Sequence, residues 1–210
     1  MKFVRFSNGG DAAYGVVDGD TVKEISNSPI GQDYSETGAT HDLNEIKILA
    51  PNPNPSKMLC LALNYGSHLL GANRPSRPQP FYKNTNAIIG PGDPIKLPPD
   101  AGLVVCESEL IAIIGKEASK VSEADALDYV FGYTAGNDVS AREWQSGANA
   151  DIQWWRAKSS DTFAPTGPFI VTDIDPQNVD IRGLVNGVEG QKCHSSEMIF
   201  TTAQAISYIS

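Results

Sequence analysis

The chain has 210 residues, of which 40% are hydrophobic and 20% are charged, as in an ordinary globular protein with a sizeable core. Its formal net charge of −9 argues against nucleic-acid binding, which needs a basic surface, and no apolar stretch approaches the roughly 20 residues of a membrane span. The N-terminus lacks the apolar core of a signal peptide, and the three cysteines are too few and too widely spaced for a disulfide framework. We therefore expect a cytoplasmic protein with reduced cysteines and no nucleic-acid or membrane partner.

The first 50 residues predict a small β-rich domain. Two β-branched runs flank Asp18-Gly19, a dipeptide that favours the tight turn of a β-hairpin. Residues 50–57 then contain three prolines, which fix the backbone and remove hydrogen-bond donors, so this stretch is typical of a stiff connector. We place a boundary there, between a small domain in residues 1–50 and a larger domain in residues 57–210.

The larger domain is expected to be mostly β with short helices, an α+β class. The apolar run over residues 57–65 predicts a buried strand, and the proline-rich residues 74–99 predict loops and short strands. A further strand is expected over residues 104–114. The Asn186-Gly187 pair marks another hairpin turn.

Two stretches predict helices in this domain. Ser122 is a good N-cap for a helix over residues 121–130. Thr201 or Thr202 caps a second helix, which carries apolar residues at helical spacing up to the end of the chain.

Two glutamates interrupt the apolar run of residues 104–114. Glu107 and Glu109 are two residues apart, so both side chains point to the same face of a β-strand. A buried carboxylate must be neutralised, paired or bound to a cation, because burying it alone is strongly unfavourable. Asp138 follows the next apolar strand, and three such oxygen donors suit Mg²⁺, Mn²⁺ or Ca²⁺ better than zinc. The E-x-E pattern by itself favours a plainer interpretation, in which both glutamates line the open face of an edge strand.

Five segments along the larger domain carry a more specific signal: GLVVCESELIAIIGK, YVFGYTAGNDVSAREWQ, WWRAKSSDTFAPTGPFIVT, LVNGVEGQ and MIF. Together they resemble the fumarylacetoacetate hydrolase family, in order from about residue 57 to the end. The resemblance implies a mixed β-sandwich roll as the catalytic domain and a homodimer. It also implies a divalent cation, typically Mg²⁺ with Mn²⁺ or Ca²⁺ as substitutes, held by Glu107, Glu109 and Asp138.

The resemblance implies roles for five other residues. His68 corresponds to the family's histidine that activates water or moves a proton, a task that suits an imidazole because its pKa lies near neutral pH. Lys158 would supply positive charge where an enolate develops. Arg142, Gln145 and Thr162 are expected to bind the substrate.

Each of these assignments has a plainer alternative. A lone histidine such as His68 is typical of a satisfied core or surface residue, and Arg142 can form a structural ion pair with a metal ligand. Lys158 can be a solvated lysine, although the tryptophans just before it weigh against this. Lys83 matches a family position as well, but the sequence assigns it no role.

Two departures from the family's pattern affect the expected chemistry. In decarboxylating and tautomerising members, a glutamate three residues after the histidine pairs with it, and here that position is Gly71. Family members also continue past the position of Ser210 with loops that shape the substrate pocket. We therefore expect the functional polypeptide to extend beyond residue 210.

We predict from these signals a metal-dependent hydrolase that cleaves a carbon–carbon bond in an acylpyruvate-like or β-diketo 2-oxo acid, in the catabolism of aromatic or related compounds. The alternative within the family is an isomerase, tautomerase or decarboxylase of a related 2-oxo acid. An alternative of another class is an inactive or partner-binding protein of the same fold. The complete set of metal ligands and the lysine argue against it, since a binding module does not need them all.

Overall fold

The computed structural model describes residues 1–69, 71 and 73–210, and it is mostly β-sheet with short helices, which confirms the expected fold class. The strands are β1 (Lys2–Ser7), β2 (Ala13–Asp18), β3 (Thr21–Ile25), β4 (Glu36–Asp42), β5 (Lys47–Leu49), β6 (Met58–Ala62), β7 (Gln79–Lys83), β8 (Ile88–Ile89), β9 (Val104–Val105), β10 (Ser108–Ile114), β11 (Val130–Asn137), β12 (Ser140–Ala141), β13 (Ala164–Val171), β14 (Asp180–Val185) and β15 (Val188–His194). The α-helices are α1 (Arg142–Gln145), α2 (Trp155–Ser159) and α3 (Thr202–Ile209), and the 3₁₀ helices are η1 (Gly66–Leu69), η2 (Thr85–Ala87), η3 (Ala126–Tyr129) and η4 (Ser195–Glu197).

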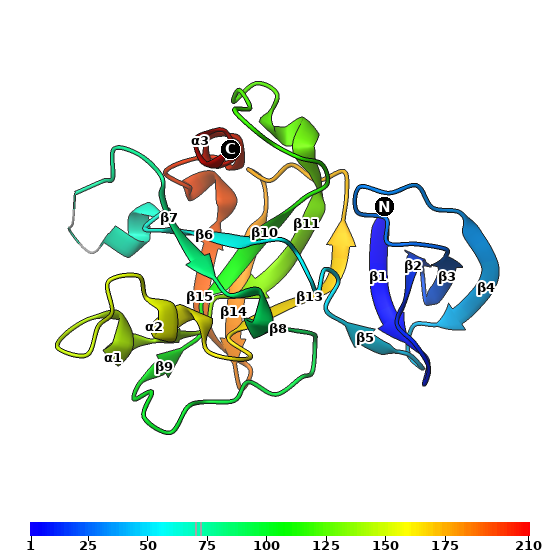
Figure 1. The fold of residues 1–210 in the computed structure, drawn as a ribbon, viewed down its shortest axis with the longest axis horizontal. Coiled ribbons are helices and arrows are strands. Elements are labelled where there is room, and N and C mark those ends of the chain that lie inside the picture. The colour runs from blue at the N-terminus through cyan, green and yellow to red at the C-terminus, as the bar shows by residue number, and fades with distance from the viewer. Residues whose placement is uncertain (70, 72) are drawn as a thin grey trace.

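The described residues form one nine-stranded sheet and three two-stranded sheets (Figure 1). The large sheet has the order β10-β11-β13-β1-β2-β3-β4, while β5 pairs with β1 and β8 pairs with β13. The small sheets pair β12 with β9, β14 with β15 and β6 with β7. The β-rich N-terminal segment thus shares a sheet with the rest of the chain, because β1 runs antiparallel to β13.

Both predicted hairpins are present. Asp18 pairs with Thr21, so the turn between β2 and β3 consists of the two residues between them. Val185 pairs with Val188 between β14 and β15, and the intervening Asn186 has a φ of 53°. A tight hairpin turn requires positive φ angles, so the Asp-Gly and Asn-Gly dipeptides predicted both turns correctly.

The predicted helix over residues 121–130 is wrong, because only the 3₁₀ turn η3 forms there. Ser122 caps the turn before η3 instead, since its Oγ accepts a hydrogen bond from the Asp125 N–H at 3.3 Å, whereas Asp125, the N-cap residue of η3, makes no side-chain capping bond. The chain then enters β11 at Val130, and the Tyr129 carbonyl accepts a hydrogen bond from the Gly115 N–H at 2.9 Å. Sheet pairing therefore begins where the predicted helix was expected to end. The terminal helix α3 is confirmed.

Apolar side chains cover both faces of the large sheet at β1. Phe3, Ile25, Ile113 and Ile170 form one buried cluster, and the next residue, Val4, belongs to a second cluster because successive strand residues alternate between faces. A third cluster lies under α1 and α2 and includes Phe163. It supports the helix that carries Lys158.

The helices and the cysteines of the described residues can be compared with the expectations from the sequence. In the described part of the chain, no helix is both long and apolar enough to cross a membrane. Cys60, Cys106 and Cys193 are free thiols, as expected from their number and spacing.

Replacing Phe3 with alanine should lower the free energy of unfolding by about 3–5 kcal/mol, because the change leaves a cavity in a close-packed core. Phe3 is 1% exposed, and its ring lies 5.4 Å from that of Phe131. Urea denaturation measures the change. Leu184→Ala is the control, since Leu184 is 60% exposed and should alter stability by less than about 0.5 kcal/mol. Equal losses in both variants would contradict the position of Phe3 in the core.

Candidate active site

Three carboxylates meet where β10 begins and β11 ends. Glu109 on β10 pairs with Gly136 on β11, which brings Glu107 beside Asp138. The Asp138 N–H donates to the Glu107 carbonyl at 2.8 Å, and the Glu107 N–H donates to Oδ1 of Asn137 at 3.0 Å. We call Glu107, Glu109 and Asp138 the acidic cluster.

Two buried lysines neutralise part of the acidic cluster. Lys158 Nζ lies 2.7 Å from Oε2 of Glu107 and 2.5 Å from Oδ2 of Asp138. Lys83 Nζ lies 2.5 Å from Oδ1 of Asp138. Both lysines are 2% exposed, so these ion pairs are shielded from water. Of the three ways to bury a carboxylate, this chain uses pairing for Glu107 and Asp138.

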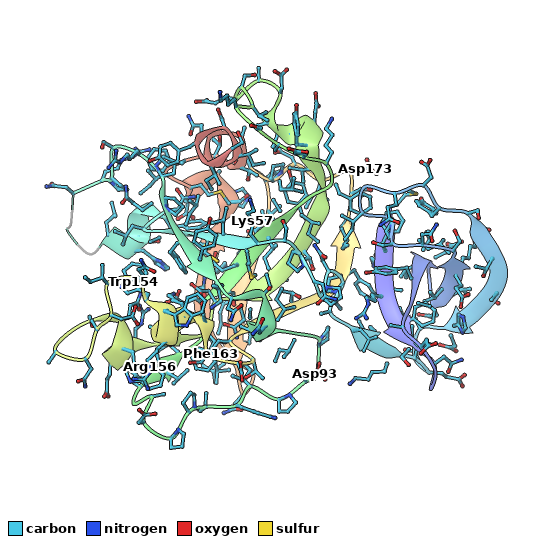
Figure 2. All side chains as sticks on the ribbon, viewed as in Figure 1. Lys57, Asp93, Trp154, Arg156, Phe163 and Asp173 are labelled. Carbon is cyan, nitrogen blue, oxygen red and sulfur yellow. The ribbon has the colours of Figure 1, made fainter. Side chains whose placement is uncertain are left out.

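The segment around α2 fixes the position of Lys158. The Asp151 carboxylate, which precedes the helix, accepts hydrogen bonds from its first two backbone N–H groups, those of Trp155 at 2.8 Å and Arg156 at 3.3 Å. Figure 2 shows Trp154, Arg156 and, close to them, Phe163, whose cluster Trp154 contacts. The helix is therefore packed on its inner side, and its buried lysine is directed at the acidic cluster.

Arg142 is the third cation of the site. Its Nη2 lies 2.7 Å from Oε1 of Glu107, and its Nη1 donates to Oε1 of Gln145 at 2.8 Å. Arg142 thus forms an ion pair with Glu107, a predicted metal ligand. This is the alternative interpretation of Arg142 that the sequence left open. Its side chain is 46% exposed, so it also faces solvent. The substrate-binding roles of Arg142 and Gln145 stay predictions.

His68 and Thr162 lie apart from this network. His68 is exposed on η1, and within the described residues its ring makes no hydrogen bond. Thr162 uses its Oγ1 to accept a hydrogen bond from the Lys96 N–H at 2.8 Å. The catalytic role of His68 and the substrate-binding role of Thr162 therefore stay predictions. Gly71 has a φ of 89°, and no atom of the residues that the structure describes lies within 4 Å of where a Cβ would be.

Glu109 is the member of the acidic cluster that has no hydrogen-bond or ion-pair partner among the described residues. In the described part of the chain, no side chain or backbone donor lies within hydrogen-bonding distance of its carboxylate, although Glu107 and Asp138 are each paired. Burial, together with the negative charges of Asp138 and Glu107, raises the pKa of Glu109 to about 8, although Lys158 and Lys83 act in the opposite direction. The carboxylate lacks a compensating positive charge.

The donor set fits the divalent cation implied by the family resemblance. Among residues 1–69, 71 and 73–210, no three His, Cys, Asp or Glu side chains are arranged as a ready metal site, and lysines pair with two of the three carboxylates of the acidic cluster. Yet the cluster offers only carboxylate oxygens, which hard cations prefer, and Glu109 has no protein partner. Glu107, Glu109 and Asp138 are therefore the residues that would hold such an ion.

Sequence-based reasoning missed the importance of Lys83. It ends β7, which pairs with β6, and this places its ammonium against Asp138, 55 residues further along the chain. The only sequence signal was its match to a family position. Burial, together with the charge of Asp138, raises the pKa of the Cys60 thiol on β6 to about 12.

Comparison with known proteins decides the family. Residues 57–210 match the family model described as fumarylacetoacetate (FAA) hydrolase C-terminal, and residues 1–51 match the one described as Rv2993c-like, N-terminal. The chain belongs to the fumarylacetoacetate hydrolase family. The resemblance inferred from the five sequence segments is confirmed.

Two curated relatives of this family member differ in the share of their length that it covers. Protein Rv2993c of Mycobacterium tuberculosis is 39% identical over 222 residues, which cover 100% of this chain and 82% of the relative. Oxaloacetate tautomerase fahd2, mitochondrial, of Xenopus laevis is 42% identical over 172 residues, or 80% of this chain. The match covers 54% of the frog protein, so this chain spans about half the length of that relative.

Two solved structures share the fold over the whole chain. A 5-carboxymethyl-2-hydroxymuconate delta-isomerase from Mycobacterium smegmatis has a TM-score of 0.91 at 38% identity, with 100% of this chain and 82% of the isomerase covered. A maleylpyruvate hydrolase from Sphingobium sp. SYK-6, in complex with manganese(II) and pyruvate, has a TM-score of 0.79 at 28% identity, with 100% and 83% covered. Hydrolases, isomerases and tautomerases thus all occur among the relatives.

Replacing Lys83 with methionine should lower the free energy of unfolding by about 3 kcal/mol, at the lower end for a broken buried ion pair, because Lys158 still compensates part of the Asp138 charge. Lys47→Met is the matched control. It breaks the exposed pair with Asp93, which should contribute less than about 1 kcal/mol. Equilibrium denaturation of both variants without added metal tests this. A Lys83→Met protein as stable as the control would show that the buried pair is not needed for the fold.

Proposed function

We propose that this family member isomerises a 2-oxo dicarboxylic acid by moving a proton between carbon and the keto oxygen, as in the keto–enol tautomerisation of oxaloacetate. The observation that carries the proposal is the buried Lys158 ammonium, held by Glu107 and Asp138 at 2.7 and 2.5 Å. A cation fixed in this way stabilises the negative charge of an enolate oxygen without reorganising during the reaction.

The similarities to known enzymes support isomerisation over the hydrolysis predicted from the sequence. The frog tautomerase and the mycobacterial isomerase are 42% and 38% identical to this chain, whereas the maleylpyruvate hydrolase is 28% identical. Both kinds of reaction develop an enolate, but hydrolysis also needs a base that activates water. Within the described residues the His68 ring has no hydrogen-bonding partner, and Gly71 stands where tautomerising members have the glutamate that pairs with this histidine, so His68 would transfer the proton without that partner.

The charge of the site fits a dianionic substrate. Three carboxylates face three cationic side chains, namely Lys83, Lys158 and Arg142. A divalent cation bound by Glu107, Glu109 and Asp138 would polarise the keto group as a Lewis acid. It would leave the site with two positive charges, which two substrate carboxylates balance. The manganese and pyruvate bound by the maleylpyruvate hydrolase support this choice of ion and ligand class.

The chain's own residues then divide the work. Arg142 binds and orients a substrate carboxylate, since its guanidinium is half exposed, and Gln145 holds the guanidinium in position. Lys158 stabilises the enolate oxygen. His68 moves the proton, and its exposed position on η1 leaves its ring free to do so.

Deuterium exchange tests the reaction type. The purified protein with Mg²⁺ should accelerate the incorporation of deuterium from D₂O at carbon 3 of oxaloacetate, measured by NMR, and a chelator should remove the acceleration. In a parallel assay, release of two acids from an acylpyruvate reports hydrolysis. Acid release without accelerated exchange would overturn the proposed isomerase in favour of the hydrolase.

Replacing Lys158 with methionine should lower kcat for this exchange by about 10²–10³-fold, the usual effect of removing a donor that stabilises an oxyanion. Lys192→Met is the control, because Lys192 is exposed on β15 and should leave kcat unchanged. A change confined to KM would assign Lys158 to substrate binding alone.

Replacing His68 with alanine should lower kcat by about 10²–10⁴-fold, as expected for a general acid or base. The affinity for Mg²⁺ should not change, because His68 is not among the proposed ligands. His41→Ala, in the N-terminal segment, serves as the control. Normal turnover by His68→Ala would return His68 to an ordinary surface residue.

A further inference from the structure

Ser108 separates the two glutamates of the acidic cluster and lies at an edge of the large sheet. Among the described residues, β10 is the first strand in the order of this sheet, so only one of its sides has a neighbouring strand. Backbone N–H and C=O groups on the other side of such a strand lack the partners that a sheet provides. At Ser108, a side chain from another segment bonds both of these groups.

That side chain is Gln191 on β15. Its Oε1 accepts a hydrogen bond from the Ser108 N–H at 2.7 Å, and its Nε2 donates to the Ser108 carbonyl at 2.8 Å. A side-chain amide offers both an acceptor and a donor, so one glutamine can bond the two groups as a neighbouring strand would. Gln191 ends the segment LVNGVEGQ, to which the proposed function gives no role.

The β14–β15 hairpin approaches β10 closely at Gly183. This glycine pairs with Gln191 across the hairpin. A Cβ at Gly183 would lie 2.5 Å from Oγ of Ser108, which is closer than a Cβ atom approaches another atom. The missing side chain therefore allows the hairpin to bring the Gln191 amide against Ser108.

The backbone of Glu107 is held as well. Its N–H donates to Oδ1 of Asn137 at 3.0 Å, and its carbonyl accepts from the Asp138 N–H at 2.8 Å. Together with the two bonds from Gln191 to Ser108, all four polar backbone groups of these two residues are hydrogen bonded. The backbone that joins the two glutamates is therefore fixed from both sides.

We propose that Gln191 is a positioning residue for the metal site. By holding both backbone groups of Ser108, it fixes the orientation of the two flanking glutamates relative to each other, so that their carboxylates can bind one divalent cation. Groups that orient metal ligands change metal affinity by about 10–100-fold when they are lost. The inference rests on the metal site of the proposed function but not on which reaction the site catalyses.

The variant Gln191→Met tests this, because it keeps the length of the side chain and removes both hydrogen bonds. The Mn²⁺ affinity measured by calorimetry should fall about 10-fold, at the lower end of the range, since Gln191 acts through the backbone of the ligands and not on their carboxylates.

Gln177→Met is the matched control. Gln177 is half-buried like Gln191, and its amide also bonds two backbone groups, the Ser195 carbonyl at 3.3 Å and the Thr202 N–H at 3.2 Å. Neither of these residues adjoins a member of the acidic cluster in the chain, so Gln177→Met should bind Mn²⁺ with unchanged affinity.

Urea denaturation without metal separates positioning from a structural role. Each variant loses two hydrogen bonds to the backbone, so both should lower the urea midpoint to a similar extent, whereas only Gln191→Met should lose Mn²⁺ affinity. An equal loss of Mn²⁺ affinity in both variants would show a general effect of lower stability and would overturn the inference.

Gln191→Asn is the second variant, and it decides the question if Gln191→Met does not fold. It keeps an amide but is one methylene shorter, so it cannot reach both groups of Ser108, and its Mn²⁺ affinity should also fall. Unchanged Mn²⁺ affinity in the folded Gln191 variant overturns the inference and leaves the proposed metal site intact. An unmodified, folded protein that binds no Mn²⁺ overturns both.

Discussion

The double ion pair of Asp138 is the interaction on which the site depends. One carboxylate oxygen contacts Lys83 and the other contacts Lys158, each at 2.5 Å. The two lysines come from β7 and α2, so one buried side chain joins three segments that are distant in the sequence. Because a buried charge is tolerated only with a well-placed partner, these pairs determine how the β6–β7 hairpin and α2 pack against the end of β11.

Within the acidic cluster, the three carboxylates are not equally paired with cations. Glu107 forms ion pairs with Arg142 and Lys158, whereas Glu109 forms no ion pair in the described part of the chain. Native proteins pair their buried polar groups, and positions that break this rule are expected at functional sites. A bound divalent cation would supply the positive charge that the described residues do not place beside Glu109.

Local signals predicted the fold well where a few neighbouring residues decide the structure. The turn at Asn186 and the cap of α3, in which the Thr201 side chain accepts from the Gln204 N–H at 3.2 Å, follow from residue types at fixed spacing. The helix expected after Ser122 failed for the opposite reason. Its residues have a helical pattern, but they form only turns and η3 before Val130 enters β11 and pairs with Ile114 of β10, so long-range pairing limits the length of the helix.

The sequence by itself determined the kinds of residue in the site: two glutamates on one strand face, an aspartate after the next strand, and the motifs that identify the family. Only the tertiary structure decided their partners. It joined Lys83 to Asp138 and Arg142 to Glu107, and it engaged Thr162 with the Lys96 backbone. Chain spacing does not reveal these pairs, because contacts between distant segments depend on how strands register and helices pack, which no local pattern encodes.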